Sequence, residues 1–337
     1  MRGIKAVAQR AGVHFSTVSR VLSHPEVVAP STRARVLAAI KALNYAPNTA
    51  AAGLRRQQSG KILVITPDLS NAIFPMVLGG IEAAAHEAGF AVLLGYTAWG
   101  ERDREDRYAR MMANAEADGL VFLSPEVPRA ARQMVAAATR GRPARVVNVL
   151  SCEPAARIPS VSIDNERAAS DAVDYLLSLG HRRIGLVTGP RGVIVDARVR
   201  GVRKRLRQAG LRGTLPWVEE SLSIEGGRHG AERLLAQHRE LTAIFCTKDE
   251  QAIGALQGAR LRGLRVPQDL SVVGFDGVVI AQHTQPPLTT VTQPMDALGR
   301  TAVRLLIDII GGVGIAPKVT LPHQLVVRKS TAPPRRR

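Results

Sequence analysis

Residues 4–22 read IKAVAQRAGVHFSTVSRVL, and this stretch decides the fold of the amino-terminal part of the chain. From Ile4 to Ala11, apolar residues recur at the spacing i, i+3, i+4 and i+7, which is typical of one helical face. Gly12 ends this helix, and a second short helix is predicted over 16–22. Its inward-facing residues are expected to be Val18, Val21 and Leu22.

A third helix follows, for which Ser31 is a favourable N-cap residue. It is expected to bury Val36, Leu37, Ile40 and Leu43 and to end near Asn44. Helix, glycine turn, short helix and third helix is the plan of a helix-turn-helix unit, whose second helix lies in the DNA major groove. A small three-helix domain without a DNA role fits the apolar pattern equally well. The predicted exposed face favours DNA, because it contains Phe15, Ser16, Ser19 and Arg20.

The charge of the chain is strongly positive and uneven. The 337 residues have a formal net charge of +18. Residues 1–60 contain nine Lys or Arg and one acid, Glu26, which gives +8 and leaves +10 for the rest. A local basic excess is what phosphate neutralisation requires, although an Arg-rich composition alone also produces it.

From Lys61 onward, the sequence alternates between short apolar strands and helices, which predicts parallel sheets covered by helices. The strands are expected at 62–65, 91–94, 120–123 and 146–149, and in a second series at 184–187, 243–246 and 271–275. Residues 60–67 and 183–190 are alike enough to predict duplicated halves. Two such lobes with a ligand between them form the periplasmic-binding-protein plan.

These patterns predict the following domain boundaries. Residues 1–46 form the helix-turn-helix head and 61–330 the two-lobed body, and the resemblance described below implies a hinge helix and linker at 47–60. Lobe 1 is expected over 61–160 and 292–330 and lobe 2 over 163–290, with the chain crossing between the lobes at 161–165 and 288–293. Residues 331–337 form a basic tail, of which Pro333 to Arg337 are expected to be disordered.

Residues 4–54 also closely resemble the DNA-binding head and hinge helix of the LacI/GalR family of bacterial transcriptional regulators. The resemblance rests on IKxVAxxAGVxxxTVSRVL at 4–22, on 32–48, and on AAAGL at 50–54. It implies that Phe15, Ser16 and Arg20 read bases, that Thr17 and Ser19 contact phosphates, and that Asn48 also contacts DNA. It further implies that Leu54 enters the minor groove at the operator centre, where an apolar wedge bends DNA. Gly3 departs from the family, which usually has a capping Thr or Ser there.

The body resembles the same family through PDxxNxxF at 67–74, VxIDN at 161–165, LGHRRI at 179–184, VPxDLSVVGFD at 266–276 and PLTTV at 287–291. The resemblance implies that Arg198 and Asp276 bind the effector. The further effector-site candidates are Asn71, Ile73, Phe74, Asp164, Leu222 and Lys248. Asp164 has an alternative role as the cap of the helix that begins at Asn165.

The pocket departs from the family at three positions. Lys248 stands where the family often has Asn, and Ile73 and Leu222 stand where it often has aromatic residues. Two cations with few aromatic side chains predict a small anionic effector, such as a sugar acid. The simpler alternative is that Lys248 points into solvent.

Two other classes of protein were weighed. An enzyme is disfavoured because the chain has no GxGxxG after a strand, no GxxxxGK[ST] and no GxSxG, and a structural role is expected for His181. A transport binding protein would share the two-lobed body, but it needs an export signal and has no use for a basic head. Neither Cys152 nor Cys246 has a partner at metal-ligand spacing, so no metal, disulfide or cofactor is expected.

The sequence therefore predicts a cytoplasmic repressor with no membrane segment. Its partners are a pseudo-palindromic operator in double-stranded DNA, a small-molecule effector and a second copy of itself. A homodimer is favoured over a tetramer because no leucine heptad follows the body. Inducer and corepressor action of the effector remain equally open.

Overall fold

The computed structural model describes residues 3–45, 59–98, 101–124, 129–137, 144–150, 158–211, 213, 215–313 and 318–335. The chain divides into two compact units, Met1–Ser59 and Gly60–Arg337, which are described separately. None of the helices in these ranges is both long and apolar enough to span a bilayer.

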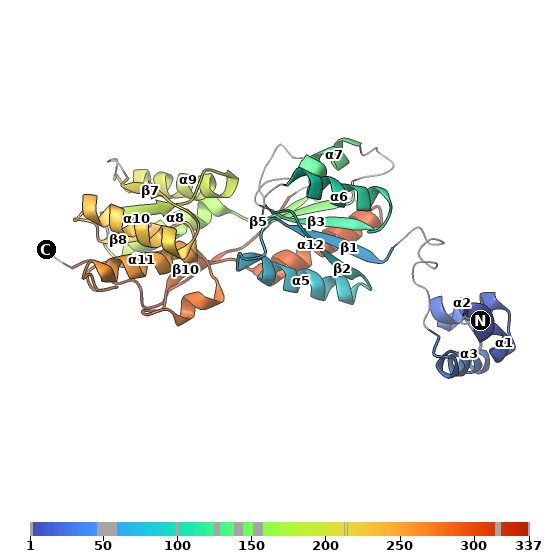
Figure 1. Ribbon diagram of the computed structural model, residues 1–337. Helices are drawn as coiled ribbons and strands as arrows, with labels where there is room; N and C mark the ends of the chain where they lie inside the picture. Colours follow the sequence, from blue (N-terminus) through green and yellow to red (C-terminus); the bar gives the residue numbers. More distant parts are fainter. Residues whose placement is uncertain are drawn as a thin grey trace. The chain divides into compact units, whose positions relative to one another are not determined.

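The first unit is a three-helix head (Figure 1). It consists of α1 (Ile4–Ala11), α2 (Phe15–Ser23) and α3 (Pro30–Ala42), with the 3-10 turn η1 (Pro25–Val27) before α3. Each helix contributes one fully buried valine to the core: Val7, Val18 and Val36. Gly12 follows α1 with φ 64°, a left-handed conformation that glycine adopts without steric cost. The predicted helix-turn-helix order is confirmed.

Three details of the predicted head are wrong. Leu22 and Leu37 were expected in the core but are 38% and 50% exposed, because their helices turn Val21 and Val36 inward instead. Ser31 does not cap α3. The helix begins one residue earlier, at Pro30, whose fixed φ suits the first helical position.

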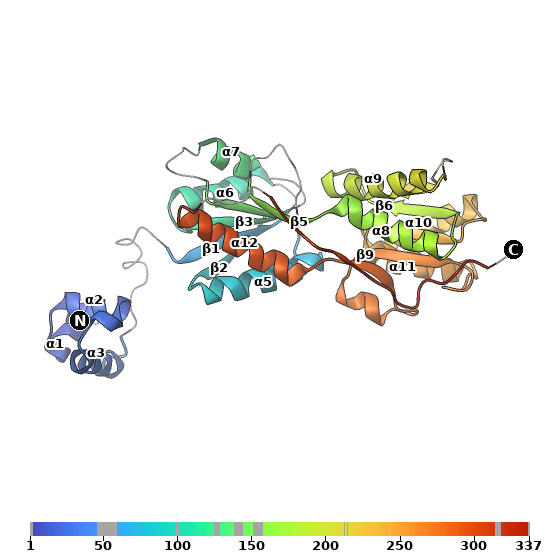
Figure 2. The same ribbon diagram turned by 180° about the vertical axis from the view of Figure 1, so that it is seen from behind.

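The second unit contains two α/β lobes (Figures 1 and 2). In lobe 1 the strands are β1 (Lys61–Thr66), β2 (Ala91–Tyr96), β3 (Gly119–Ser124), β4 (Val146–Leu150), β5 (Ser160–Ile163) and β11 (Lys318–Leu321). Its helices are α5 (Ile73–Glu87), α6 (Arg102–Ala113), α7 (Arg129–Ala137) and α12 (Met295–Ile310). The sheet has the order β2-β1-β3-β4-β5-β11, and all its pairs are parallel.

Lobe 2 repeats this order of strands. Its strands are β6 (Ile184–Thr188), β7 (Trp217–Glu219), β8 (Ala243–Cys246), β9 (Ser271–Asp276), β10 (Thr289–Thr292) and β12 (Gln324–Val326). Its helices are α8 (Asn165–Ser178), α9 (Val193–Gln208), α10 (Ile224–Gln237), α11 (Asp249–Leu261) and the 3-10 helix η3 (Val279–His283). The order is β7-β6-β8-β9-β10-β12, parallel except for the β10–β12 pair. Since β1 and β6 hold the same place in their sheets, this topology agrees with the predicted duplication.

Each sheet is covered on both faces by helices. In lobe 1, Ile62 and Val64 of β1 pack toward α5 and α12, whereas Leu63 and Ile65 pack with residues of α6 and α7. In lobe 2, α8 and α9 enclose one core, and α10 and α11 enclose another. Alternate residues of a strand point to opposite faces, so the continuous apolar runs in the sequence fill two cores each.

The chain crosses between the lobes at three places. It passes from β5 to α8 and from β10 to α12, within or next to the predicted segments, and again from β11 to β12. The third crossing was not predicted, so the expected extent of lobe 1 to residue 330 is wrong. Residues 324–330 belong to lobe 2, because β12 pairs with β10 and the Val272 amide donates to the Ser330 carbonyl.

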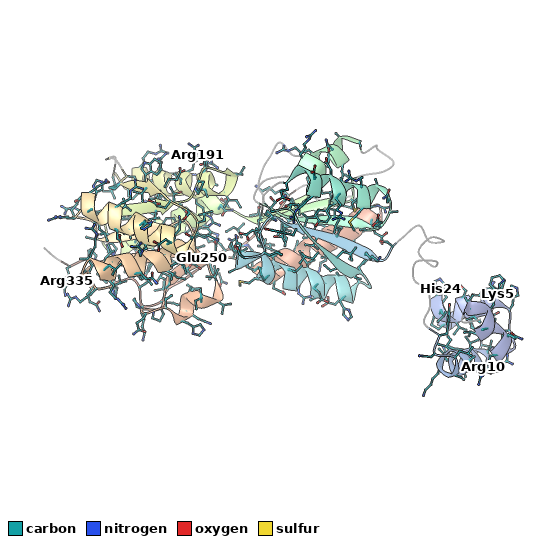
Figure 3. All side chains as sticks on the ribbon, in the orientation of Figure 1. Lys5, Arg10, His24, Arg191, Glu250 and Arg335 are labelled. Carbon is teal, nitrogen blue, oxygen red and sulfur yellow. The ribbon has the colours of Figure 1, made fainter. Side chains whose placement is uncertain are left out.

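The expectation of a disordered tail is also wrong as far as Arg335. The Ala332 amide donates to Ser271 Oγ, and the Ala332 carbonyl accepts from His181 Nε2 at 2.9 Å. Arg335 pairs with Asp269 at 2.9 Å, at the end of lobe 2 away from lobe 1 (Figure 3). His181 Nδ1 lies 2.9 Å from Thr242 Oγ1, so both ring nitrogens are engaged in fixing this segment, which supports its predicted structural role.

Candidate effector-binding and DNA-binding sites

One face of α2 carries the side chains predicted to contact DNA. Val18 and Val21 turn into the core of the head, which leaves Phe15 42% exposed and Arg20 exposed as well. Ser16, Thr17 and Ser19 are half-buried. Lys5 and Arg10 of α1 add positive charge to the surface of the same unit (Figure 3). The predicted contacts at Asn48 and Leu54 lie outside the described residues.

His14, which is not among the predicted DNA contacts, also contributes to this face. Its Nδ1 accepts from the Ser16 amide at 3.4 Å and lies 2.9 Å from Ser16 Oγ, so it caps α2. Its ring also packs on that of Phe15, with the ring centroids 4.2 Å apart. His14 therefore orients two of the side chains predicted to read bases. Its position just before an expected helix was the available signal.

In lobe 2, Arg198 is the centre of a buried polar cluster. It comes from α9, is 5% exposed, and each of its three guanidinium nitrogens donates to a protein oxygen. Nε donates to Asn165 Oδ1 at 2.9 Å, and Nη1 donates to the Thr247 carbonyl at 2.6 Å. The guanidinium also lies over the Phe275 ring, with Cζ 3.6 Å from the ring centroid. These contacts fix the charge at the carboxyl ends of β8 and β9, the edge of an α/β sheet where ligands bind.

Asp276 is the counter-ion of Arg198. Its Oδ1 accepts from Arg198 Nη2 at 2.9 Å and from Gln293 Nε2 at 2.8 Å. Burial raises the pKa of Asp276, and the charges of Arg198 and Lys248 oppose this shift. Asp276 has φ 118°, a strained conformation for a residue other than glycine, and such strain is concentrated at functional sites. The structure thus brings together the two residues that the family resemblance implies bind the effector.

Lys248 ends the loop after β8 and is only 7% exposed, so the alternative that it points into solvent is wrong. Its Nζ lies 3.1 Å from Glu250 Oε1. The sequence analysis missed Glu250. The two residues are separated by one position in the chain, and nothing in the pattern distinguished this glutamate from a solvent-exposed one.

Asp249 lies between them in sequence and is fully buried. Its Oδ2 accepts from the Gly277 and Val278 amides at 2.7 and 2.8 Å, and its Oδ1 accepts from Thr290 Oγ1 at 2.5 Å. Burial and the neighbouring charge of Asp276 raise the pKa of Asp249 to about 8. These bonds fix the loop that begins at Asp276, the last residue of β9.

The remaining predicted effector residues have other contacts. Asp164 caps α8 by accepting from the Arg167 amide at 2.9 Å, which supports its alternative role. Asn71 Oδ1 accepts from the Ile73 amide at 3.1 Å at the start of α5. The side chains of Ile73 and Phe74 belong to the lobe 1 core. Leu222 is 38% exposed and packs against Gly189, just after β6. The contact is so close that a Cβ added to Gly189 would lie 2.3 Å from Leu222 Cδ2.

Of the two cysteines, Cys152 lies outside the described residues. Cys246 is buried in β8, and burial raises the pKa of its thiol. Within the described ranges, no group of three or more His, Cys, Asp and Glu side chains is arranged to hold a metal ion.

Both parts of the chain match known families. Residues 3–48 match the bacterial regulatory proteins of the lacI family, and residues 173–331 match the periplasmic binding protein-like domain. The repressor CytR of Escherichia coli (strain K12) is 35% identical over 332 residues, which cover 97% of this chain and 96% of CytR.

Solved structures give the same result for the whole fold. A lac repressor dimer bound to operator and the anti-inducer ONPF has a TM-score of 0.86 at 30% identity, covering 97% of this chain and 98% of that one. A complex of the transcriptional regulator CelR with cellobiose has a TM-score of 0.73 at 30% identity, covering 98% and 100%. These relatives are transcriptional regulators, which confirms the predicted family and fold class. The chain belongs to the LacI family of bacterial regulatory proteins.

Proposed function

We propose that the protein is a transcriptional repressor that binds a pseudo-palindromic operator as a homodimer and responds to a small molecule bound in its two-lobed body. The observation that carries the proposal is the exposed face of α2, where Phe15 and Arg20 lie outside a closed apolar core. The second helix of a helix-turn-helix unit reads base edges in the major groove, and two copies related by a twofold axis read two half-sites.

The buried cluster around Arg198 and Asp276 supports an effector site. Ligands of open α/β sheets bind beyond the carboxyl ends of the strands, and both residues lie there, next to β8 and β9. Two related regulators are seen with bound small molecules, the lac repressor with ONPF and CelR with cellobiose. An effector whose binding free energy differs by about 1–3 kcal/mol between two conformations would change operator affinity enough for regulation. This holds whether the effector acts as an inducer or as a corepressor.

We also propose that the protein acts by binding rather than by catalysis, and in the cytoplasm. The whole-chain likeness to CytR supports both points, because an operator-binding protein acts where the chromosome is. A metabolic role would require turnover of a candidate ligand by the purified protein.

The test is a selection of genomic DNA fragments by the purified protein, repeated with Leu54→Ala and with Leu37→Ala as a control in an exposed leucine of α3. We expect a pseudo-palindrome with a central C·G step, weakened by Leu54→Ala and unchanged by Leu37→Ala. Binding that is sequence-independent and lost at moderate salt would refute the repressor function, since that behaviour reflects phosphate contacts alone.

A further inference from the structure

Two carboxylate oxygens in lobe 2 are buried without a donor. Asp276 Oδ2 and Glu250 Oε2 have no hydrogen-bond partner within the described part of the chain. The Asp276 residue is 1% exposed and the Glu250 side chain 19% exposed. Figure 3 shows Glu250 on the side of lobe 2 that faces lobe 1. Buried polar atoms in native proteins almost always have a partner, so each of these atoms can accept from a donor that the described residues do not supply.

The cations near these oxygens already have partners. Arg198 donates from all three of its nitrogens, to Asn165, Thr247 and Asp276. The Lys248 ammonium is paired with Glu250 Oε1 at 3.1 Å. The sequence analysis predicted an anionic effector by counting Arg198 and Lys248 as free cations. The structure pairs each of them with a carboxylate that the count left out.

The charge balance also disfavours an anion. Arg198 with Asp276 and Lys248 with Glu250 make two neutral pairs, and the adjacent Asp249 contributes no positive charge. An anionic ligand would add a negative charge without a counter-ion to a poorly hydrated cluster, and such a charge is strongly disfavoured. A neutral ligand with hydrogen-bond donors would satisfy both free oxygens without changing the charge.

We propose that Glu250 contacts the effector, and that Glu250 and Asp276 together accept hydrogen bonds from a neutral ligand carrying at least two hydroxyl groups. Lys248 positions the Glu250 carboxylate through the ion pair on its other oxygen. This inference rests on the proposed function of the body as an effector-binding unit. It adds Glu250 as a specificity-determining residue and replaces the anionic class of ligand by a neutral one.

The experiment is calorimetry on the full chain with two sets of probes. The neutral set contains pentoses, hexoses, disaccharides and ribonucleosides, and the acidic set contains the matching sugar acids and sugar phosphates. We expect a neutral compound to bind and its acidic counterpart to bind at least tenfold more weakly. Tight binding of an acidic compound, or binding of none of the neutral ones, would overturn the ligand class.

Glu250→Gln tests the residue itself, with Glu225→Gln as the control, because Glu225 is an exposed glutamate of α10 that pairs with Arg228. We expect Glu250→Gln to weaken binding of the neutral compound by about 10–100-fold, the range for loss of a hydrogen bond to a charged group. It should also strengthen binding of the acidic probes, since Lys248 then lacks its counter-ion. An unchanged affinity for the neutral compound would overturn the role of Glu250.

Operator binding separates this inference from the proposed function. If a neutral compound binds in a Glu250-dependent manner but leaves operator affinity unchanged, the ligand assignment stands and the regulatory function of the site fails. If a compound changes operator affinity and Glu250→Gln alters neither its binding nor its effect, the proposed function stands and this inference fails.

Discussion

Replacing Arg198 by methionine should destabilise the body more than any exposed charge change. The substitution keeps an apolar stem over Phe275 but removes the donors to Asn165, Thr247 and Asp276, all of which are buried. Removing one partner of a buried ion pair leaves the other charge without compensation, at a cost of about 3–5 kcal/mol. We therefore expect the urea midpoint, followed by circular dichroism, to fall sharply.

Two further variants isolate the ion pair. Arg200→Met removes an exposed arginine from the same helix, where its Nε lies 3.4 Å from Glu166, and should change stability by about 0.5 kcal/mol or less. Arg198→Met combined with Asp276→Asn should cost less than the sum of the two single changes, because the stranded carboxylate charge is gone. A loss of under about 1 kcal/mol for Arg198→Met would refute the argument, since the guanidinium would then be solvated.

Three other predictions follow from single contacts. Arg20→Ala, in the exposed face of α2, should weaken operator binding measured by fluorescence anisotropy by about 1–3 kcal/mol while leaving thermal stability unchanged, and an unaltered affinity would remove Arg20 from the interface. Gly80→Ala should destabilise lobe 1 by about 1–3 kcal/mol, because its Cβ would lie 2.2 Å from the Asp296 carbonyl oxygen, whereas Gly79→Ala meets nothing within 4 Å and serves as the control in the same unfolding assay. Burial lowers the pKa of His181, so the unfolded state binds the proton more tightly and stability should fall as the pH drops below about 6.5. The decrease between pH 7.5 and 5.5 should be smaller in His181→Gln, and equal decreases in the two proteins would contradict this assignment.

The strands and the family were predictable from the sequence because each rests on long, redundant patterns. The run from Ile62 to Ile65 is apolar on both faces, which only a strand buried between two helical layers requires. The positions of Leu22 and Leu37 were not predictable. In helices of only nine and 13 residues, a neighbouring residue lies about 100° away, so the pattern accommodates either residue as the buried one.

Contacts between distant segments were also outside what periodicity can show. The third crossing depends on β12 pairing with β10, and a three-residue strand carries almost no pattern of its own. The partner of Lys248 was missed for a different reason. Residues two apart on a helix do not normally face each other, and the local sequence does not show that Lys248 and Glu250 are buried.

The cluster in lobe 2 lies against two of the three interlobe crossings, which bears on how a ligand could act at a distance. Asn165 follows the crossing from β5 to α8 and accepts from Arg198, whereas Gln293 lies in the crossing from β10 to α12 and donates to Asp276. Both segments are therefore linked to Asp276, Gln293 directly and Asn165 through Arg198. A ligand shifts a conformational equilibrium only by the difference in its affinity for the two states. If the bonds of Asn165 and Gln293 differ between two angles of the lobes, a ligand bound to Asp276 gains such a difference in affinity through them.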